Sequence, residues 1–153
     1  MNHMVEDVKI EQETEKEDYR GIIDQYFETH QAFFKNDTSK VVFLEGVLVG
    51  FVLEAQRMTN PDKKGNEPFW GTLHDLRIDQ RLLMELFPKA VNKLKQLGYS
   101  YKSLVKEISA YMQNTGATWG LTPVELSWYF SHGLASYQNF RRKKQDNLTS
   151  KEE

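Results

Sequence analysis

One long apolar segment constrains the fold of this chain more than any other feature. From Lys40 to Arg57 the residues are apolar around nearly the whole circumference of a helix. The run is long for a strand, although Val41 and Val42 alone would suit one. Gly46 and Gly50 stand four residues apart, which opens one helical face to close approach by another helix. The segment therefore predicts a buried central helix.

Apolar spacing predicts a helix before this segment, and turn residues predict a loop after it. Side chains from Ile22 to Phe34 recur at helical spacing over about four turns. Ser39 follows a cluster of turn residues and is the expected N-cap of the central helix. Residues Thr59–Gly71 are rich in Pro, Gly and Asn and predict a long loop. A short helix or turn is expected at Leu73–Leu76.

The C-terminal half carries clearer helix boundaries. Asp79 can cap a helix whose apolar stripe continues to Gly98, a residue suited to a C-terminal cap. Pro88 within that stripe should end or kink the helix, or begin the next one. Another amphipathic helix is expected over Tyr101–Asn114. Thr122-Pro123-Val124-Glu125 then forms a capping box that opens the last helix. The fold class predicted is all-α, a compact bundle of five to six helices.

Charge divides the chain into three parts. Residues 1–17 predict an acidic flexible arm, 18–145 the helical bundle domain and 146–153 a disordered tail. The net charge of −2 is the balance of −4 over residues 1–20, +4 over 21–145 and −2 over 146–153. The folded part is therefore mildly basic between two acidic ends.

Composition excludes several classes of function. The chain has no cysteine, which rules out disulfides, thiolate metal sites and cysteine nucleophiles and suits a cytoplasmic protein. The start of the chain does not resemble a signal peptide. The longest apolar stretch, Val41–Ala55, contains two glutamates, so no membrane span is expected. These glutamates, Glu45 and Glu54, are expected to reach the surface or to meet Arg57 or another base.

No arrangement of residues predicts catalysis. His74-Asp75 is the dipeptide of helical metal-dependent phosphohydrolases, but one such pair cannot complete a metal shell. None of the histidines in the expected bundle has a glutamate three residues before it, as a di-iron site would need. There is also no phosphate-binding glycine loop and no nucleophile beside a base. We therefore expect no catalytic residue, no metal ligand and no cofactor.

The positive signal is electrostatic. From Leu86 through Lys106 there are five lysines and no acidic residue. On helical projections Lys89 and Lys93 share one solvent-facing strip with Gln96, and Lys102 and Lys106 begin another. Such strips bind phosphates without reading sequence, although a simple solvated face is the alternative. The predicted nucleic-acid contacts are basic side chains: Lys63, Lys64, Arg77, Arg81, Lys89, Lys93, Lys102, Lys106, Arg141 and Arg142.

Four segments in a particular order resemble a known family. They are Phe43–Gly50, Pro68-Phe69-Trp70, Leu86–Leu94 and Tyr129–Leu134. In this order they are similar to the C-terminal helical domain of the large subunit of type I-B CRISPR Cascade complexes. The resemblance spans Asp18 to Asn139, nearly the whole expected bundle.

The resemblance implies a role within a larger complex. In that family the C-terminal domain is also produced alone, from an internal translation start, as the Cascade small subunit. Such subunits lack catalytic activity and lie along the hybrid of guide RNA and target DNA, where they stabilise the R-loop and the displaced strand. The expected partners are the large subunit, the backbone subunits, further copies of the chain itself, guide RNA and target DNA.

The residues leave two alternative functions open and also suggest a protein–protein contact through aromatic side chains. A helix-turn-helix regulator could place the Thr122–Lys144 helix in a major groove, and a phosphohydrolase could use His74-Asp75. Aromatic side chains that could anchor a protein interface are Phe69, Trp70, Trp128 and Tyr137. For Trp128, burial in the bundle's own core is the alternative.

Overall fold

The computed structural model describes residues 19–59, 78–99, 101–115 and 119–152. Within these residues there are five α-helices, one short 3-10 helix and no strand, which confirms the predicted all-α bundle. The helices are α2 (Tyr19–Thr29), η1 (Gln31–Phe33), α3 (Asp37–Thr59), α5 (Gln80–Gln96), α6 (Lys102–Gln113) and α7 (Pro123–Glu152). The predicted acidic arm, most of the Thr59–Gly71 loop and the element at Leu73–Leu76 lie outside the described residues.

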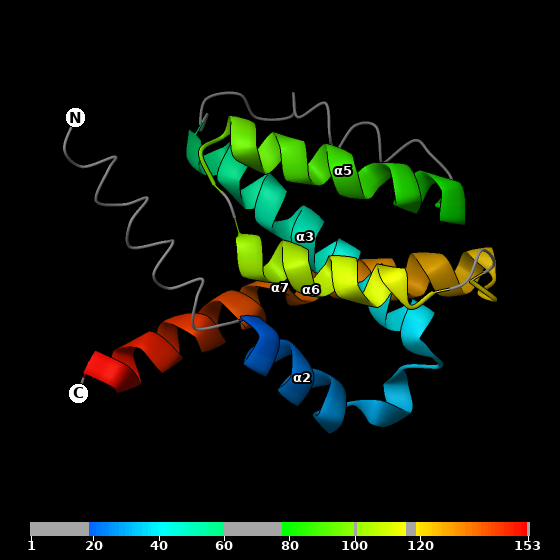
Figure 1. The fold of residues 1–153 in the computed structure, drawn as a ribbon, viewed down its shortest axis with the longest axis horizontal. Coiled ribbons are helices and arrows are strands. Elements are labelled where there is room, and N and C mark those ends of the chain that lie inside the picture. The colour runs from blue at the N-terminus through cyan, green and yellow to red at the C-terminus, as the bar shows by residue number, and fades with distance from the viewer. Residues whose placement is uncertain (1–18, 60–77, 100, 116–118, 153) are drawn as a thin grey trace.

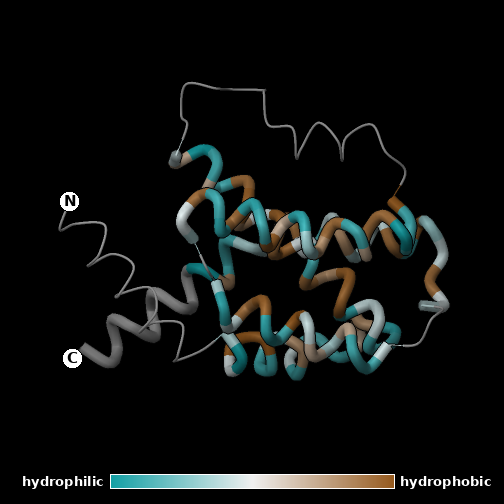
Figure 2. The backbone as a smooth tube through the Cα atoms, turned by 45° about the horizontal axis from the view of Figure 1, so that its top comes forward, coloured by the Kyte–Doolittle hydropathy of each residue, from teal (hydrophilic) through white to brown (hydrophobic). Residues whose placement is uncertain are grey.

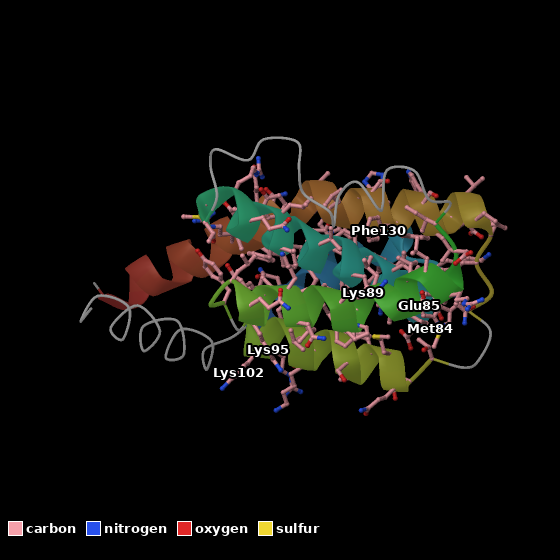
Figure 3. All side chains as sticks on the ribbon, turned by 90° about the horizontal axis from the view of Figure 1, so that it is seen from above. Met84, Glu85, Lys89, Lys95, Lys102 and Phe130 are labelled. Carbon is pink, nitrogen blue, oxygen red and sulfur yellow. The ribbon has the colours of Figure 1, made fainter. Side chains whose placement is uncertain are left out.

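Helix α3 lies at the centre, as the long apolar segment predicted. Figure 1 shows α5 on one side of it and α2 on another, and Figure 3 shows α6 and α7 on opposite sides. Every residue from Val41 to Val52 is buried. The shell helices are amphipathic, and hydrophobic and hydrophilic stretches alternate along them in Figure 2. The surfaces open to solvent therefore belong mainly to the shell helices.

The closest helix contact joins α3 to α7 at glycines. A Cβ placed on Gly46 would lie 3.0 Å from the Cα of Gly133 and would overlap the carbonyl oxygen of Phe130. A Cβ on Gly133 would in turn overlap the carbonyl oxygen of Phe43. The close approach predicted for the Gly46 face is therefore present, and α7 is the helix that uses it.

Helix α3 begins earlier than predicted. Asn36, and not Ser39, is the residue that caps it: the Asn36 side-chain oxygen accepts a hydrogen bond from the Ser39 amide at 2.8 Å. The Ser39 hydroxyl oxygen accepts one from the Asn36 amide at 3.2 Å. This reciprocal pair satisfies two amides at the start of the helix. The prediction of Ser39 as N-cap was wrong because Ser39 occupies the third helical position of the same capping arrangement.

The two glutamates of α3 differ in their surroundings. Glu54 forms an ion pair with Arg141 of α7, as expected for a glutamate that meets a base. Glu45 was expected to reach solvent or a base, and this was wrong: it is 1% exposed, and neither carboxyl oxygen has a hydrogen-bond partner within the described part of the chain. Since α3 is enclosed on all sides, no solvent edge is available at Glu45. Burial raises the pKa of its carboxyl group well above the ordinary value.

Helix α5 passes through Pro88 without a break. The side chain of Asp79 caps its start by accepting a hydrogen bond from the Leu82 amide at 2.7 Å, as predicted. Pro88 neither ends the helix nor starts a new one. Both Pro88 and Met84, whose carbonyl loses its helical donor to the proline, are exposed, so solvent can satisfy that carbonyl. A continuous helix is therefore tolerated at this position.

The first predicted helix is divided in two at His30. Helix α2 ends at Thr29, and η1 follows. The Thr29 hydroxyl donates to the carbonyl oxygen of Gln25 at 2.8 Å, and His30 Nδ1 lies 2.9 Å from the carbonyl oxygen of Tyr26. Side-chain bonds of this kind compete with helix continuation, and they explain why the helix stops short of Phe34.

Helix α7 begins at the predicted capping box. The Thr122 amide donates to Glu125 Oε1 at 2.9 Å, and the Glu125 amide donates to Thr122 Oγ1 at 3.1 Å. These bonds lower the pKa of Glu125. The helix continues to Glu152, so residues 146–152 are helical, within the segment 146–153 for which a disordered tail was expected. After Gly133 the helix contains neither proline nor glycine, so no residue stops it at 145.

Candidate nucleic-acid interface

Helix α5 turns its lysines away from its buried side. Its residues packed toward α3 are Leu83, Leu86, Ala90 and Leu94. Lys89 is exposed and Lys93 is half-buried at the edge of the apolar face. The predicted strip of Lys89 and Lys93 therefore lies along one flank of α5.

Helix α6 presents two lysines on its outer side. Leu104 and Ile108 are buried against the core. Lys102 and Lys106 are exposed one turn apart, and Gln113 is exposed further along the helix. Among the described residues, no ion pair involves Lys89, Lys93, Lys102 or Lys106. Their charges are therefore available to a phosphate backbone, and the contact itself remains a prediction.

Lys95 joins this surface although helical periodicity did not indicate it. It is exposed, and it lies with Lys102 beside the turn that links α5 to α6 (Figure 3). Lys95 stands six positions after Lys89, about 120° away around the helix, so it lies beside Lys102 and outside the Lys89 strip. It was missed because helical spacing from Lys89 does not include it. The glycine at position 98 was the available sequence signal that the chain reverses and brings Lys95 near Lys102.

Two of the four arginines predicted to contact nucleic acid form ion pairs within the molecule. Arg81 and Glu85 form an exposed ion pair at 3.4 Å one turn apart on α5. Arg141 pairs with Glu54 across the α3–α7 contact. Arg141 therefore joins α3 to α7 through this ion pair, and its contact with nucleic acid stays a prediction. Arg142 belongs to α7 by its backbone alone, since its side chain is outside the described part, as are Lys63, Lys64 and Arg77.

Acidic side chains gather on a different part of the molecule. Asp24 of α2, Asp37 of α3 and Glu107 of α6 all raise the pKa of Tyr111, after the larger effect of partial burial. The negative charge of these three carboxylates is therefore felt at Tyr111. The neighbourhood of Tyr111 would repel phosphate, whereas the surface of Lys95, Lys102 and Lys106 would attract it.

Exposed apolar side chains mark a further surface at the start of α7. Trp128 is 49% exposed and Val124, one turn earlier, is 78% exposed. The Trp128 ring lies 4.9 Å from that of Phe33 and 5.1 Å from that of His132. Trp128 is therefore not a core residue. Tyr137 is buried, so its predicted role as an interface anchor was wrong, and Phe69 and Trp70 lie outside the described residues.

Two other observations concern alternative functions. Within the described ranges, no three His, Asp or Glu side chains gather closely enough to hold a metal ion. His74 and Asp75 lie outside those ranges. None of the helices that the structure describes is long and apolar enough to cross a membrane.

Comparison with known protein families gives a match over most of the chain. The family model described as the C-terminal domain of CRISPR-associated protein TM1802 matches residues 1–147. Comparisons with curated proteins and with solved structures found no match. The family match confirms what four sequence segments indicated, a resemblance to the C-terminal domain of a CRISPR large subunit.

Proposed function

The chain belongs to the family of CRISPR-associated TM1802 C-terminal domains, and from this we propose that it is the small subunit of a type I-B CRISPR Cascade surveillance complex. In this role it has no catalytic activity. It lies along the hybrid of guide RNA and target DNA, and it stabilises the R-loop and the displaced strand through sequence-independent backbone contacts.

The observation that carries this proposal is the lysine surface of α5 and α6. Lys89, Lys95, Lys102 and Lys106 are exposed on two consecutive helices, without an acidic residue between Leu86 and Lys106. Lysines without fixed carboxylate partners gain free energy by releasing counterions from a nucleic-acid backbone, whatever its sequence. In the hybrid of guide RNA and target DNA, base pairing already reads the sequence. A subunit that lies along this hybrid therefore needs contacts to the nucleic-acid backbone that do not depend on sequence.

The helix-turn-helix alternative finds no supporting observation in the described residues. The first half of α7 buries Leu126, Tyr129 and Phe130. The residues between α6 and α7 are described only in part, at 114–115 and 119–122. The first turns of α7 carry no lysine or arginine, whereas α5 and α6 carry the exposed lysines of the proposed surface.

The test compares two double variants with equal change in net charge. Lys102→Gln with Lys106→Gln removes two charges from the proposed surface. Arg20→Gln with Lys35→Gln removes two exposed charges that pair with Asp24 and Glu125. Assembled complexes carrying each variant are titrated with target DNA at several salt concentrations, and strand separation is measured.

The lysine variant should weaken R-loop formation and reduce the salt slope of binding by about 0.7 to 0.9 per lysine removed. The Arg20–Lys35 control should behave as wild type. Equal R-loop formation by both variants at every salt concentration would contradict the proposed contact.

A further inference from the structure

The turn between α5 and α6 has an unusual backbone. Gly98 adopts a positive φ of 87°, and its amide donates to the carbonyl oxygen of Lys95 at 3.1 Å. The Tyr99 amide donates to the carbonyl oxygen of Leu94 at 2.8 Å, which completes a Schellman motif. Tyr101 has φ 41° and ψ 44°, and it is the one described non-glycine residue with positive φ. Left-handed conformations disfavour side chains with a Cβ, and they concentrate at functional sites.

This backbone holds two tyrosine rings in a fixed relation. The rings of Tyr99 and Tyr101 are nearly parallel, at 7° and 6.0 Å between centroids. The Tyr101 ring is anchored in the bundle, 4.7 Å from that of Phe51. Tyr99 is partly exposed. Since Tyr101 is packed on Phe51 and hydrogen bonds hold the chain from Leu94 to Tyr99, the Tyr99 ring is positioned before any ligand arrives.

Two exposed lysines flank these rings. Lys95 precedes the turn and Lys102 follows it, and Figure 3 shows both at this end of the helix pair. The lysine surface thus contains an aromatic ring at the point where its two helices meet. A basic surface with an aromatic ring is the usual arrangement for binding single-stranded nucleic acid, because lysines meet the phosphates and the ring meets a base.

We propose that the α5–α6 turn is a single-strand binding site at which Tyr99 stacks on an unpaired base while Lys95 and Lys102 contact the adjoining phosphates. The inference rests on the proposed function and makes it more specific. Bases within a duplex are already stacked on one another, so the Tyr99 ring can act on an unpaired strand only. The ligand is a single strand of any sequence, since every base has a face on which an aromatic ring can stack.

The experiment measures binding of the full chain to a labelled oligothymidine of about 16 nucleotides and to a duplex of equal length. The variants are Tyr99→Ala, Tyr99→Phe and Lys102→Gln. Tyr111→Ala is the matched control, because Tyr111 is a partly buried tyrosine on α6 whose pKa is raised by the charges of Asp24, Glu107 and Asp37. Losing Tyr111 removes a similar ring from the bundle on its acidic side.

Tyr99→Ala should weaken single-strand binding by about fivefold or more, whereas Tyr99→Phe should bind as wild type. Tyr99→Ala should also leave the salt slope and the duplex affinity unchanged, because it removes no charge. Lys102→Gln should lower the salt slope for the single strand by about 0.7.

Three results would overturn the inference. If Lys102→Gln weakens binding but Tyr99→Ala does not, the base-stacking site is absent and the proposed lysine contacts stand. If Tyr99→Ala weakens single-strand and duplex binding equally, or no more than Tyr111→Ala, the ring has a structural role only. If the wild-type chain binds no single strand at any salt concentration, the site is absent, and R-loop formation by the assembled complex then decides the proposed function separately.

Discussion

Gly46 of α3 and Gly133 of α7 meet backbone to backbone, so that a Cβ on Gly133 would lie 3.1 Å from the Cα of Gly46. A methyl group at either position must push the two most extensively packed helices apart. We expect Gly133→Ala to lower the free energy of unfolding by about 2 kcal/mol or more, as overpacking does in other cores. Denaturant unfolding measures the change.

A glycine in an exposed helical position provides the control. Gly21 of α2 is exposed, and Gly21→Ala should raise stability slightly, by up to about 1 kcal/mol, because alanine favours the helix. Equal effects of the two substitutions would show that the close helix contact does not limit stability.

Replacing Glu45 by leucine should stabilise the protein. The carboxyl group is buried without a hydrogen-bond partner in the described residues, and leucine removes this unsatisfied group at similar volume. We expect a gain of about 2 kcal/mol in the free energy of unfolding at neutral pH. Glu45→Gln should gain less, since the amide is also polar.

The gain from Glu45→Leu should depend on pH. The pKa of Glu45 in the folded protein is raised above its ordinary value of 4.5. Below 4.5 the carboxyl group is protonated in both the folded and the unfolded chain. Above it the unfolded chain ionises first, so the wild type loses up to about 1.4 kcal/mol per pH unit until the folded pKa is reached. The advantage of Glu45→Leu should therefore be larger at about pH 7 than at about pH 4, and a constant advantage would contradict the raised pKa.

The pair of Glu54 and Arg141 should contribute to stability and not to nucleic-acid binding. Both side chains are partly buried, so their coupling in a double-mutant cycle of Glu54→Ala and Arg141→Ala should be about 1 kcal/mol. Arg141→Gln should leave the salt slope of DNA binding as in wild type. A reduced salt slope for Arg141→Gln would show that Arg141 also contacts the nucleic-acid backbone.

Trp128 is expected to anchor a contact with another protein of the complex. Trp128→Ala should weaken incorporation into the assembled complex while changing the melting temperature little, because the ring is half exposed. Trp119 is 4% exposed and supplies the matched control. Trp119→Ala should cost about 3 kcal/mol or more of stability. If both variants lose stability and incorporation in the same proportion, Trp128 acts within the bundle.

Sequence patterns predicted those features of the fold that depend on residues close together in the sequence. Asp79 and Thr122 cap their helices through bonds that span three residues, so the local sequence was sufficient. Arg141 lies 87 residues from Glu54, and no local pattern indicates that pairing. Glu45 was misjudged for the same reason, because its burial follows from helices packed on all sides of α3.

The candidate site was predicted in part. Lys102 and Lys106 share one face of a single helix, and helical periodicity was enough to place them together. The meeting of Lys95 with Lys102 depends on how sharply the chain reverses at Gly98 and Tyr101. A left-handed tyrosine is too uncommon to be expected from sequence.

The enclosure of α3 makes the molecule a spacer. Packed helices stand about 8–10 Å apart, so α6 and α7, on opposite sides of α3 (Figure 3), are held about 16–20 Å apart. A macromolecule bound along Lys102 and another bound at Trp128 would therefore lie on different sides of α3, which itself contacts neither. Substitutions on the Lys102 side should then leave binding at Trp128 unaffected, and the reverse, since the energetic effects of distant sites add. Each of the two surfaces can therefore be redesigned while α3 is left unaltered.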